Sequence, residues 1–281
     1  MIVVTGATGN VGRTLVRTLA EAGEQVTAVS RGSQDIALPD SVRHQRADLT
    51  ELDTLSTAFV GAKALFLHDT GMSAHLMDPR AILELAAAGG VERIVQLSSQ
   101  GVVTRAGSAS HGNLGRSFED AVRESGMEWT ILRPGGFASN AFAWIESVRT
   151  RRTLAAPFGD IGLPIIDPSD IAEVAAAVLR EDGHSGQSYE LTGPALSTPR
   201  QRAAAIGDAL GEPIEFVEQT PAEARAQMLR FMPEPVVETT LTILGTPNPA
   251  EQRISPDVEK VLGRAPRTFA DWAQRNIVAF R

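Results

Sequence analysis

The chain has 281 residues, a formal net charge of −8 at pH 7 and no cysteine. It is long enough to bury a full core, while its acidic balance, without a basic stripe, argues against binding to nucleic acid. Without cysteine there are no disulfides, thiolate ligands or thiol nucleophiles, and we expect no metal site. We also expect a cytoplasmic protein without a membrane partner, because no apolar run reaches the length of a span and the first residues predict a core strand instead of a signal peptide.

The chain opens with a short β-branched run, residues 1–4, that leads into a glycine-rich turn. Such a run is typical of a parallel strand that is covered on both faces. Gly6, Gly9 and Gly12 follow with G-x-x-G-x-x-G spacing, a variant of the dinucleotide-binding fingerprint. Residues 10–22 predict an amphipathic helix whose first N–H groups would face phosphates. This context predicts a dinucleotide site; the alternative is a glycine-rich turn in another α/β protein.

The end of the second predicted strand, residues 25–30, indicates which dinucleotide binds. A site for NAD usually carries Asp or Glu about twenty residues after the glycines, whereas an Arg accommodates the 2′-phosphate of NADP. Here Arg31 follows the strand, and the first carboxylate is Asp35. The planar guanidinium suits a phosphate, so we predict NADPH as the cofactor. The alternative for Arg31 is a solvated loop residue.

Strand and helix patterns then alternate with short loops, which predicts a doubly wound parallel sheet. We expect strands at residues 42–46, 63–68, 93–98 and 128–132, and helices at residues 52–59, 81–88 and 114–124. Ligands of such folds lie at the carboxyl ends of the strands. One rim is therefore expected to collect the loops that begin at Gly6, Arg31, Asp48, His68, Ser98 and Pro134.

The alternation changes after about residue 136. We expect a helix at 142–148, a strand at 163–166, a helix capped by Ser169 or Asp170, a strand at 189–192, and helices at 200–210, 221–229, 236–243 and from 268. Residues 1–155 would form a dinucleotide-binding domain, to whose sheet residues 163–193 return, and residues 194–281 a smaller substrate-binding cap. The predicted fold class is α/β: a doubly wound parallel Rossmann sheet with a mostly helical C-terminal cap.

Motifs along nearly the whole chain resemble one family. They are T-G-A-T-G-N-V-G at 5–12, Asp48-Leu49, Leu97-Ser98-Ser99, W-T-I-L-R-P-G-G-F at 129–137 with Asn140, Asp170-Ile171-Ala172, Y-E-L-T-G-P at 189–194 and L-G-R-A-P-R-T-F at 262–269. The chain resembles the NmrA-like branch of the atypical short-chain dehydrogenases/reductases. That branch includes quinone, ketone and azo-dye reductases beside members that bind NADP(H) only to sense redox state.

The resemblance implies how the cofactor would lie. The glycine turn would hold the pyrophosphate and Arg31 the 2′-phosphate, while Asp48 and Leu49 would border the adenine; the alternative for Asp48 is an exposed loop carboxylate. His68 would lie beside the ribose, and residues 134–137 would flank the nicotinamide. The residues assigned to the cofactor are Gly6, Thr8, Gly9, Asn10, Val11, Gly12, Arg31, Asp48, Leu49, His68, Ser98, Pro134 and Phe137.

The catalytic pair of ordinary members of the superfamily is absent. Those members use Tyr-x-x-x-Lys, in which the lysine lowers the pKa of the tyrosine and the phenol exchanges a proton with the carbonyl oxygen. The single tyrosine, Tyr189, has no lysine four residues on, and neither Lys63 nor Lys260 lies in the expected segment. This mechanism is therefore excluded, and hydride transfer would depend on alignment, exclusion of water and polarisation of the acceptor.

Three residues are candidates for catalysis in place of that pair. His111 lies where the tyrosine is expected, and histidine titrates near neutrality; the alternative is a loop histidine without a catalytic role. Ser99 and Gln100 follow a rim strand and could hydrogen-bond a carbonyl, with Gln100 in the place of the catalytic serine. His68 is a second candidate for the proton donor, and solvent is another.

Five residues are candidates for contact with the acceptor. Asn140 could orient it through the side-chain amide, and Phe142 and Trp144 could form a flat apolar wall. Met228 and Phe231 suit a flexible apolar lid, because methionine adapts to irregular surfaces. The alternative for all four apolar residues is packing in the core.

These features predict an NADPH-dependent reductase that transfers hydride directly to a quinone or aromatic ketone, its small-molecule partner. The alternative is a non-catalytic NADP(H)-binding regulator, in which occupancy of the cofactor site shifts the conformation of the cap. The missing Tyr-x-x-x-Lys pair favours that alternative. A third hypothesis, a structural domain with a decayed site, is disfavoured because the turn keeps all its glycines.

Overall fold

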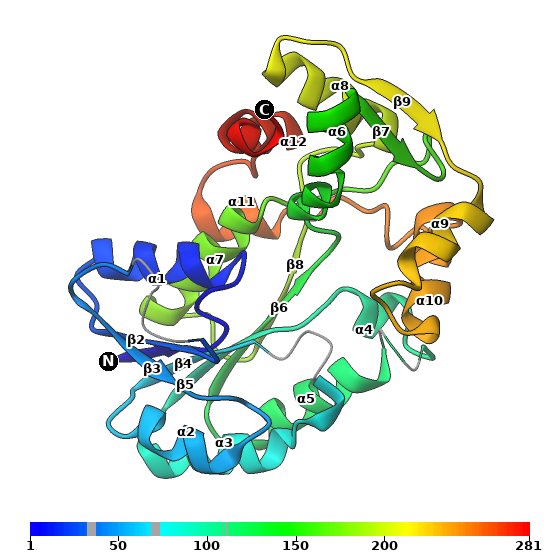
Figure 1. Ribbon diagram of the computed structural model, residues 1–281. Helices are drawn as coiled ribbons and strands as arrows, with labels where there is room; N and C mark the ends of the chain where they lie inside the picture. Colours follow the sequence, from blue (N-terminus) through cyan, green and yellow to red (C-terminus); the bar gives the residue numbers. More distant parts are fainter. Residues whose placement is uncertain (33–37, 69–73, 109, 111) are drawn as a thin grey trace.

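A parallel sheet of buried apolar strands forms the centre of the computed structural model, which describes residues 1–32, 38–68, 74–108, 110 and 112–281 (Figure 1). In these residues the sheet has seven strands, in the order β3-β2-β1-β4-β5-β6-β8, and each pair is parallel. They are β1 (Ile2–Val4), β2 (Val26–Ser30), β3 (Val42–Arg46), β4 (Ala64–His68), β5 (Arg93–Leu97), β6 (Glu128–Pro134) and β8 (Gln187–Leu191). The predicted doubly wound sheet is thereby confirmed.

The order of the strands reverses at β1. The chain runs from β1 through β2 to β3 on one side, and then crosses to β4 on the other side of β1. In open α/β sheets, ligands bind in the crevice outside the carboxyl ends of the strands at such a point. The glycine turn follows β1 and His68 ends β4, so these predicted site residues lie at the reversal point.

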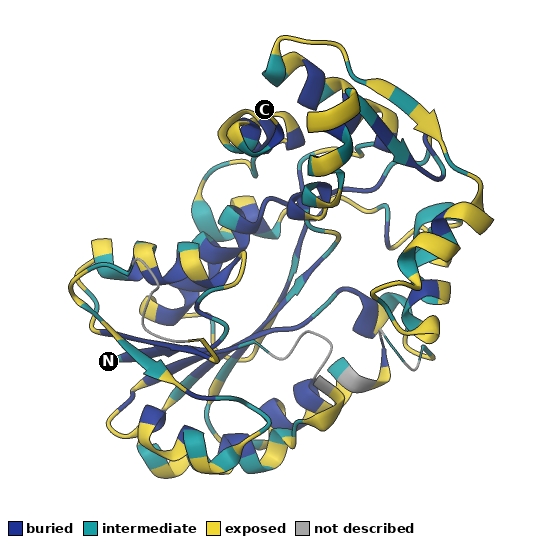
Figure 2. Ribbon diagram, viewed as in Figure 1, coloured by how far each residue is buried: buried dark blue, intermediate teal, exposed yellow. Residues whose placement is uncertain are grey.

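Helices cover both faces of the sheet, with buried inner faces and exposed outer faces (Figures 1 and 2). One apolar cluster joins the sheet to α1 (Gly12–Glu21), α7 (Pro168–Arg180) and α11 (Asp257–Leu262). A second cluster joins its other face to α2 (Leu52–Phe59), α3 (Pro79–Gly89) and α5 (Asn113–Glu124). This arrangement explains why the central strands are apolar along their whole length.

The C-terminal part has an apolar cluster of its own, which also takes in residues 138–156. Residues 138–156 thus pack with the C-terminal part, while β8 pairs with β6 in the main sheet. The division at residue 155 stays a prediction. The remaining elements are η1 (Ala74–Leu76), α4 (Gly101–Thr104), η2 (Ala138–Trp144), α6 (Ile145–Arg151), β7 (Thr153–Ala156), α8 (Pro199–Leu210), β9 (Glu215–Glu218), α9 (Pro221–Met228), α10 (Glu234–Gly245), α12 (Phe269–Asn276) and η3 (Ile277–Phe280).

Two local predictions near α7 are wrong. Residues 163–166 form no strand, and only isolated bridges join Leu163 to Ser197 and Ile166 to Phe137 in the described chain. The N-cap of α7 is Asp167, whose side chain accepts a hydrogen bond from the Ser169 amide at 2.8 Å. Throughout the described segments, each helix is too short or too polar to cross a bilayer.

Candidate active site

The glycine turn after β1 has a backbone that larger residues would disrupt. Gly6 has φ +62°, in the left-handed region that favours glycine. A Cβ atom on Gly12 would lie only 2.2 Å from the Gly6 carbonyl oxygen. The Ala7 amide is bonded to the Val29 carbonyl at 3.1 Å, which fixes the turn against the end of β2. The turn is therefore a backbone-lined cradle that fits a pyrophosphate.

His68 covers this turn from the end of β4. A Cβ atom on Gly6 would lie 3.1 Å from His68 Cγ, so the imidazole packs directly on the turn. The Thr5 hydroxyl joins the two strands, because it donates to the Phe66 carbonyl at 3.0 Å and accepts from the His68 amide at 2.8 Å. Burial lowers the pKa of His68, although a backbone hydrogen bond partly opposes that effect. His68 is therefore mainly neutral at pH 7, which weakens its candidacy as a proton donor.

The start of α1 is open to an anion. Its N-cap, Val11, has no side-chain hydrogen bond to the first amides, and the wholly described first turn contains no acidic residue. These amides and the helix dipole favour a bound anion. Val11 itself is buried, so its side chain serves the core. The carbonyl oxygen of Thr8 accepts a hydrogen bond from Arg13 Nη2 at 3.2 Å.

Asn10 links the glycine turn to the C-terminal part of the chain. Its Nδ2 donates to the hydroxyl of Ser139, 129 positions away, at 3.0 Å. Ser139 is buried in η2. Sequence reasoning missed Ser139, because no local pattern connects residues so far apart in the chain.

The end of β2 presents Arg31 beside the glycine turn. Arg31 is exposed, and among the described residues no carboxylate pairs with it. The preceding Ser30 is buried, and its Oγ lies 2.9 Å from His44 Nε2 on β3. Asp35 lies outside the described residues. The position of Arg31 is compatible with both predicted roles: an arginine that binds the 2′-phosphate, or a solvated loop residue.

Asp48 and Leu49 shape the turn that leads into α2. Asp48 Oδ1 accepts hydrogen bonds from both the amide and the hydroxyl of Thr50, each at 2.9 Å. The Asp48 amide contacts the Thr54 hydroxyl at 3.0 Å. Leu49 is half-buried against the cluster beneath α2. One oxygen of the Asp48 carboxylate is therefore engaged in the turn.

Ser98 is directed toward a buried charge. It is 2% exposed, and its hydroxyl donates to Glu119 of α5 at 2.7 Å. Glu119 also accepts hydrogen bonds from Arg133 and Arg123. Burial alone would raise the pKa of Glu119, but the hydrogen bonds from Arg133, Ser98 and Arg123 outweigh it and lower the pKa. The side chain of Ser98 thus anchors α5 beneath the rim.

The candidate catalytic residues differ in whether their polar groups are already engaged in hydrogen bonds. Gln100 is buried, and its Nε2 donates to the Ala250 carbonyl at 2.9 Å. Ser99 is half-buried, and its Oγ accepts from the Gly101 amide at 3.1 Å, which leaves its own proton for another acceptor. His111 lies outside the described residues.

The segment after β6 runs along the rim toward the C-terminal part. Pro134 is buried, and its carbonyl accepts from the Gln100 amide at 3.0 Å. Phe137 is half-buried and packs against the cluster beneath α1 and α7. Asn140 is exposed in η2. Its side-chain amide therefore remains a candidate for contact with an acceptor.

Phe142 and Trp144 pack within the C-terminal apolar cluster. The Phe142 ring lies 5.0 Å from that of Trp272. The Arg202 guanidinium lies over Trp144, 5.5 Å from the ring centroid. The packing of Phe142 favours the alternative that it is a core residue and not part of a wall for the acceptor. Trp144 differs, because its ring faces the Arg202 guanidinium.

Met228 and Phe231 lie where α9 passes into α10. Met228 is half-buried at the end of α9, and Phe231 is 53% exposed. Leu229 between them is exposed as well. Figure 1 shows these two helices standing apart from the sheet, beside α4. This apolar tip is accessible, as a lid would require.

Tyr189 has a structural environment in β8. It is 4% exposed, and its hydroxyl lies 2.8 Å from His184 Nδ1. Burial, together with the charge of Asp257, raises the pKa of Tyr189. Its side chain is therefore bonded within the fold, in keeping with the excluded Tyr-x-x-x-Lys mechanism.

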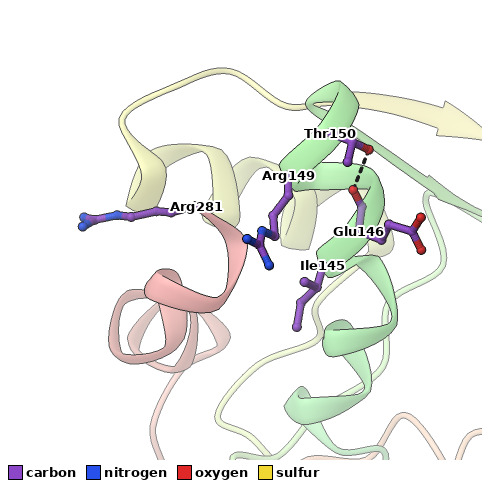
Figure 3. Close-up of a pocket in the computed structure, with 5 residues that line it drawn as sticks. All are labelled: Ile145, Glu146, Arg149, Thr150 and Arg281. Carbon is purple, nitrogen blue, oxygen red and sulfur yellow. Dashed lines mark hydrogen bonds between the residues drawn. The ribbon is translucent and has the colours of Figure 1, made fainter.

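One cavity of the described chain lies away from this rim. It has a volume of about 400 Å³, and Figure 3 shows Arg149 and Ile145 extending from α6 into it, while Arg281 points away. Its lining is completed by Glu146 and Thr150, whose side chain bonds the Glu146 carbonyl at 2.7 Å. Since no predicted site residue lines this cavity, topology is the better guide to the cofactor site.

The geometry of the rim agrees with comparisons to known proteins. A family model described as NAD(P)H-binding matches residues 6–182. The chain belongs to this NAD(P)H-binding family, in the NmrA-like branch of the atypical short-chain dehydrogenases/reductases. The family match begins at Gly6 and so includes the glycine turn and the strands from β2 to β6.

Two proteins that are similar to the chain over its whole length are named reductases. The (4-alkanoyl-5-oxo-2,5-dihydrofuran-3-yl)methyl phosphate reductase of Streptomyces griseus is 33% identical, with 100% of this chain and 99% of the relative covered. The NAD(P)H azoreductase of Xenophilus azovorans is 30% identical, with the same coverage. The NADPH-dependent quinone oxidoreductase structure from Escherichia coli has a TM-score of 0.76 at 25% identity, covering 98% of this chain and 99% of that one. The chain is therefore an NAD(P)H-dependent oxidoreductase.

Proposed function

We propose that the protein is an NADPH-dependent reductase of quinones or aromatic ketones that works by direct hydride transfer. The observation that carries this proposal is the meeting of the glycine turn and His68 where the strand order reverses. The start of α1, which has no side-chain cap, lies at the same place. The names of the relatives, which include a quinone oxidoreductase and an azoreductase, support an aromatic acceptor.

The chain's own residues would hold the cofactor through its phosphates. The glycine turn and the first amides of α1 suit the pyrophosphate, and the exposed Arg31 suits a 2′-phosphate. Asp48, Leu49, Pro134 and Phe137 are proposed to border the remaining parts. When bound, the cofactor supplies a hydride, and the acceptor takes up one further proton.

Polarisation of the acceptor is proposed to come from uncharged donors. The Ser99 hydroxyl keeps a proton to donate, whereas the Gln100 amide is engaged by Ala250. Asn140 offers an exposed amide from η2. Because burial keeps His68 mainly neutral, solvent or His111 would deliver the proton to the reduced oxygen. Hydride and proton together convert a quinone to a hydroquinone, or a ketone to an alcohol.

Stopped-flow loss of NADPH absorbance against a panel of quinones and aromatic ketones tests the activity. We expect turnover of at least one planar acceptor, and slower turnover in Ser99→Ala. Tight binding of NADPH without turnover of any acceptor would overturn the proposal and support the regulator.

Calorimetric titration of NADP⁺ and NAD⁺ tests the preference for the phosphorylated cofactor. Arg31→Ala is expected to reduce the affinity for NADP⁺ selectively. Arg43→Ala is a matched control, because Arg43 is an exposed arginine of the neighbouring strand β3. An unchanged preference in Arg31→Ala would contradict the role proposed for Arg31.

A further inference from the structure

Arg202 is a largely buried arginine of the C-terminal part of the chain. It lies in the first turn of α8 and is 8% exposed. Its Nε donates to the Thr198 carbonyl at 3.4 Å, and its guanidinium faces the Trp144 ring at 5.5 Å. Among the residues that the structure describes, no carboxylate lies within ion-pair distance of it. Burial lowers its pKa to about 10, so the side chain remains positively charged at neutral pH.

Several other arginines of this acidic chain, including the largely buried ones described next, have carboxylate partners. Arg133 pairs with the buried Glu119, and Arg105 with the buried Glu251. Even Arg200, two residues before Arg202 and far more exposed, pairs with Asp160. A buried charge without a partner is costly. At Arg202 the fold therefore keeps a largely buried guanidinium without the carboxylate that it provides for Arg133 and Arg105.

Arg202 and Trp144 come from segments that leave the rim. Residues 192–198 connect the carboxyl end of β8 to α8, and Ser197 bridges to Leu163. Trp144 ends η2, whose Ser139 is bonded to Asn10 of the glycine turn. The pair thus lies on two segments that follow β6 and β8, strands whose carboxyl ends form the rim.

We propose that Arg202 and Trp144 form a subsite for an oxyanion carried by the acceptor, such as a carboxylate, a sulfonate or a phosphate monoester. The inference rests on the proposed reductase function. Nε is bonded to Thr198 only at 3.4 Å, and the two terminal nitrogens are left to donate to the oxyanion as a planar fork. The acceptors that this subsite favours are aromatic compounds with one anionic substituent.

The test compares two acceptors that differ in charge, 1,4-naphthoquinone and its 2-sulfonate. The readout is the ratio of kcat/KM for the sulfonate to kcat/KM for the neutral quinone. In Arg202→Gln this ratio is expected to fall about 10-fold or more, because a charge-assisted bidentate contact is lost. Arg200→Gln is the control, since Asp160 already pairs with Arg200, and its ratio should not change. An unchanged ratio in Arg202→Gln overturns the subsite.

A binding measurement separates failure of the subsite from failure of the proposed function. Benzoate and inorganic phosphate are titrated calorimetrically into the full chain, without turnover. We expect saturable binding that Arg202→Gln abolishes and Arg202→Lys, which keeps the charge without the fork, weakens. If no acceptor is reduced but this binding is present and depends on Arg202, the reductase proposal fails and the subsite remains. Absence of binding in the unmodified protein, or equal binding in Arg202→Gln, overturns the subsite.

Melting temperature distinguishes a ligand site from a structural arginine. Arg202→Met removes the unpaired charge and keeps an apolar stem over Trp144, so the melting temperature is expected to stay or to rise. A lower melting temperature together with loss of NADPH binding would show that Arg202 supports the fold, and would overturn the proposal.

Discussion

At the scale of single residues, the cofactor cradle depends on the absence of one side chain. In Gly12→Ala the new Cβ would lie 2.2 Å from the Gly6 carbonyl oxygen, so the turn must open. We expect NADP⁺ affinity to fall about 100-fold and the free energy of unfolding to fall by about 1–3 kcal/mol, as for other overpacked sites. Calorimetric titration and urea denaturation measure the two effects. Gly107→Ala is the control, because its Cβ would meet nothing within 4 Å; equal affinities in the two variants would contradict the cradle.

Tyr189 tests the absence of a tyrosine mechanism. In Tyr189→Phe the hydrogen bond to His184 is lost, whereas the ring remains in β8. We expect kcat within about twofold of the parent and a loss of about 1 kcal/mol in unfolding free energy, the usual net value of one hydrogen bond. Steady-state kinetics and thermal denaturation provide the two values. A fall in kcat of two orders of magnitude would restore Tyr189 as an acid.

At the scale of elements, Glu119 docks α5 against β5 and β6 through Ser98 and Arg133. Because the folded pKa lies below the unfolded value, this group contributes stability above the unfolded pKa and loses it as pH falls through the folded pKa. Glu119→Gln should cost about 3 kcal/mol at pH 7, since Arg133 loses its buried partner. The difference from the parent should shrink below about pH 4.

Urea denaturation at several pH values measures the contribution of Glu119. Glu128→Gln is the matched control, because that carboxylate pairs with Arg93 while 55% exposed. Its cost should stay below about 1 kcal/mol, as for surface ion pairs. A cost for Glu119→Gln that does not change with pH would contradict the role of its ionised form.

The sequence predicts elements well where local signals suffice. The central strands are recognisable as continuous apolar runs because both of their faces are covered. Residues 163–166 form a similar apolar run, but Pro164 has no amide hydrogen to donate to a neighbouring strand. In the described residues only isolated bridges form there. The cap of α7 was also readable, because Pro168 at the first helical position marks Asp167 as the N-cap. These errors concern termini and short segments, and they leave the order of the sheet unaffected.

At the candidate site, the contacts between residues far apart in the chain are what the sequence could not predict. Topology alone brings the ends of β1 and β4 together, so the place of Gly6 beside His68 was predictable. The spacing of Phe142 could not show that Trp272 would pack on it. Nor could the spacing of Arg202 show that no carboxylate of the described residues would pair with it. Such features depend on how the C-terminal part folds back, for which the sequence holds no periodic signal.

At the scale of the whole molecule, the helices α9 and α10 are attached to the rest of the fold in a different way from α12. In their described residues, α9 and α10 each bury a single side chain, Ala224 and Val237 respectively. Polar contacts fasten this region to α4, where Arg105 donates to Glu251 at 2.6 and 2.7 Å and to the Thr246 carbonyl at 3.2 Å. By contrast, α12 packs three buried residues into the C-terminal cluster. Local opening should therefore be easiest in α9 and α10.

Hydrogen exchange measured by mass spectrometry tests this difference. Amides of α9 and α10 are expected to exchange about 10-fold or more faster than those of α8 and α12, because few apolar contacts must break for them to open. Glu251→Gln should accelerate exchange in α10 further, since it removes the buried partner of Arg105. Glu234→Gln is the control, because its pair with Arg225 is largely exposed. If α10 is as protected as α12 and Glu251→Gln leaves it so, these helices form a fixed wall, and Met228 and Phe231 do not act as a lid.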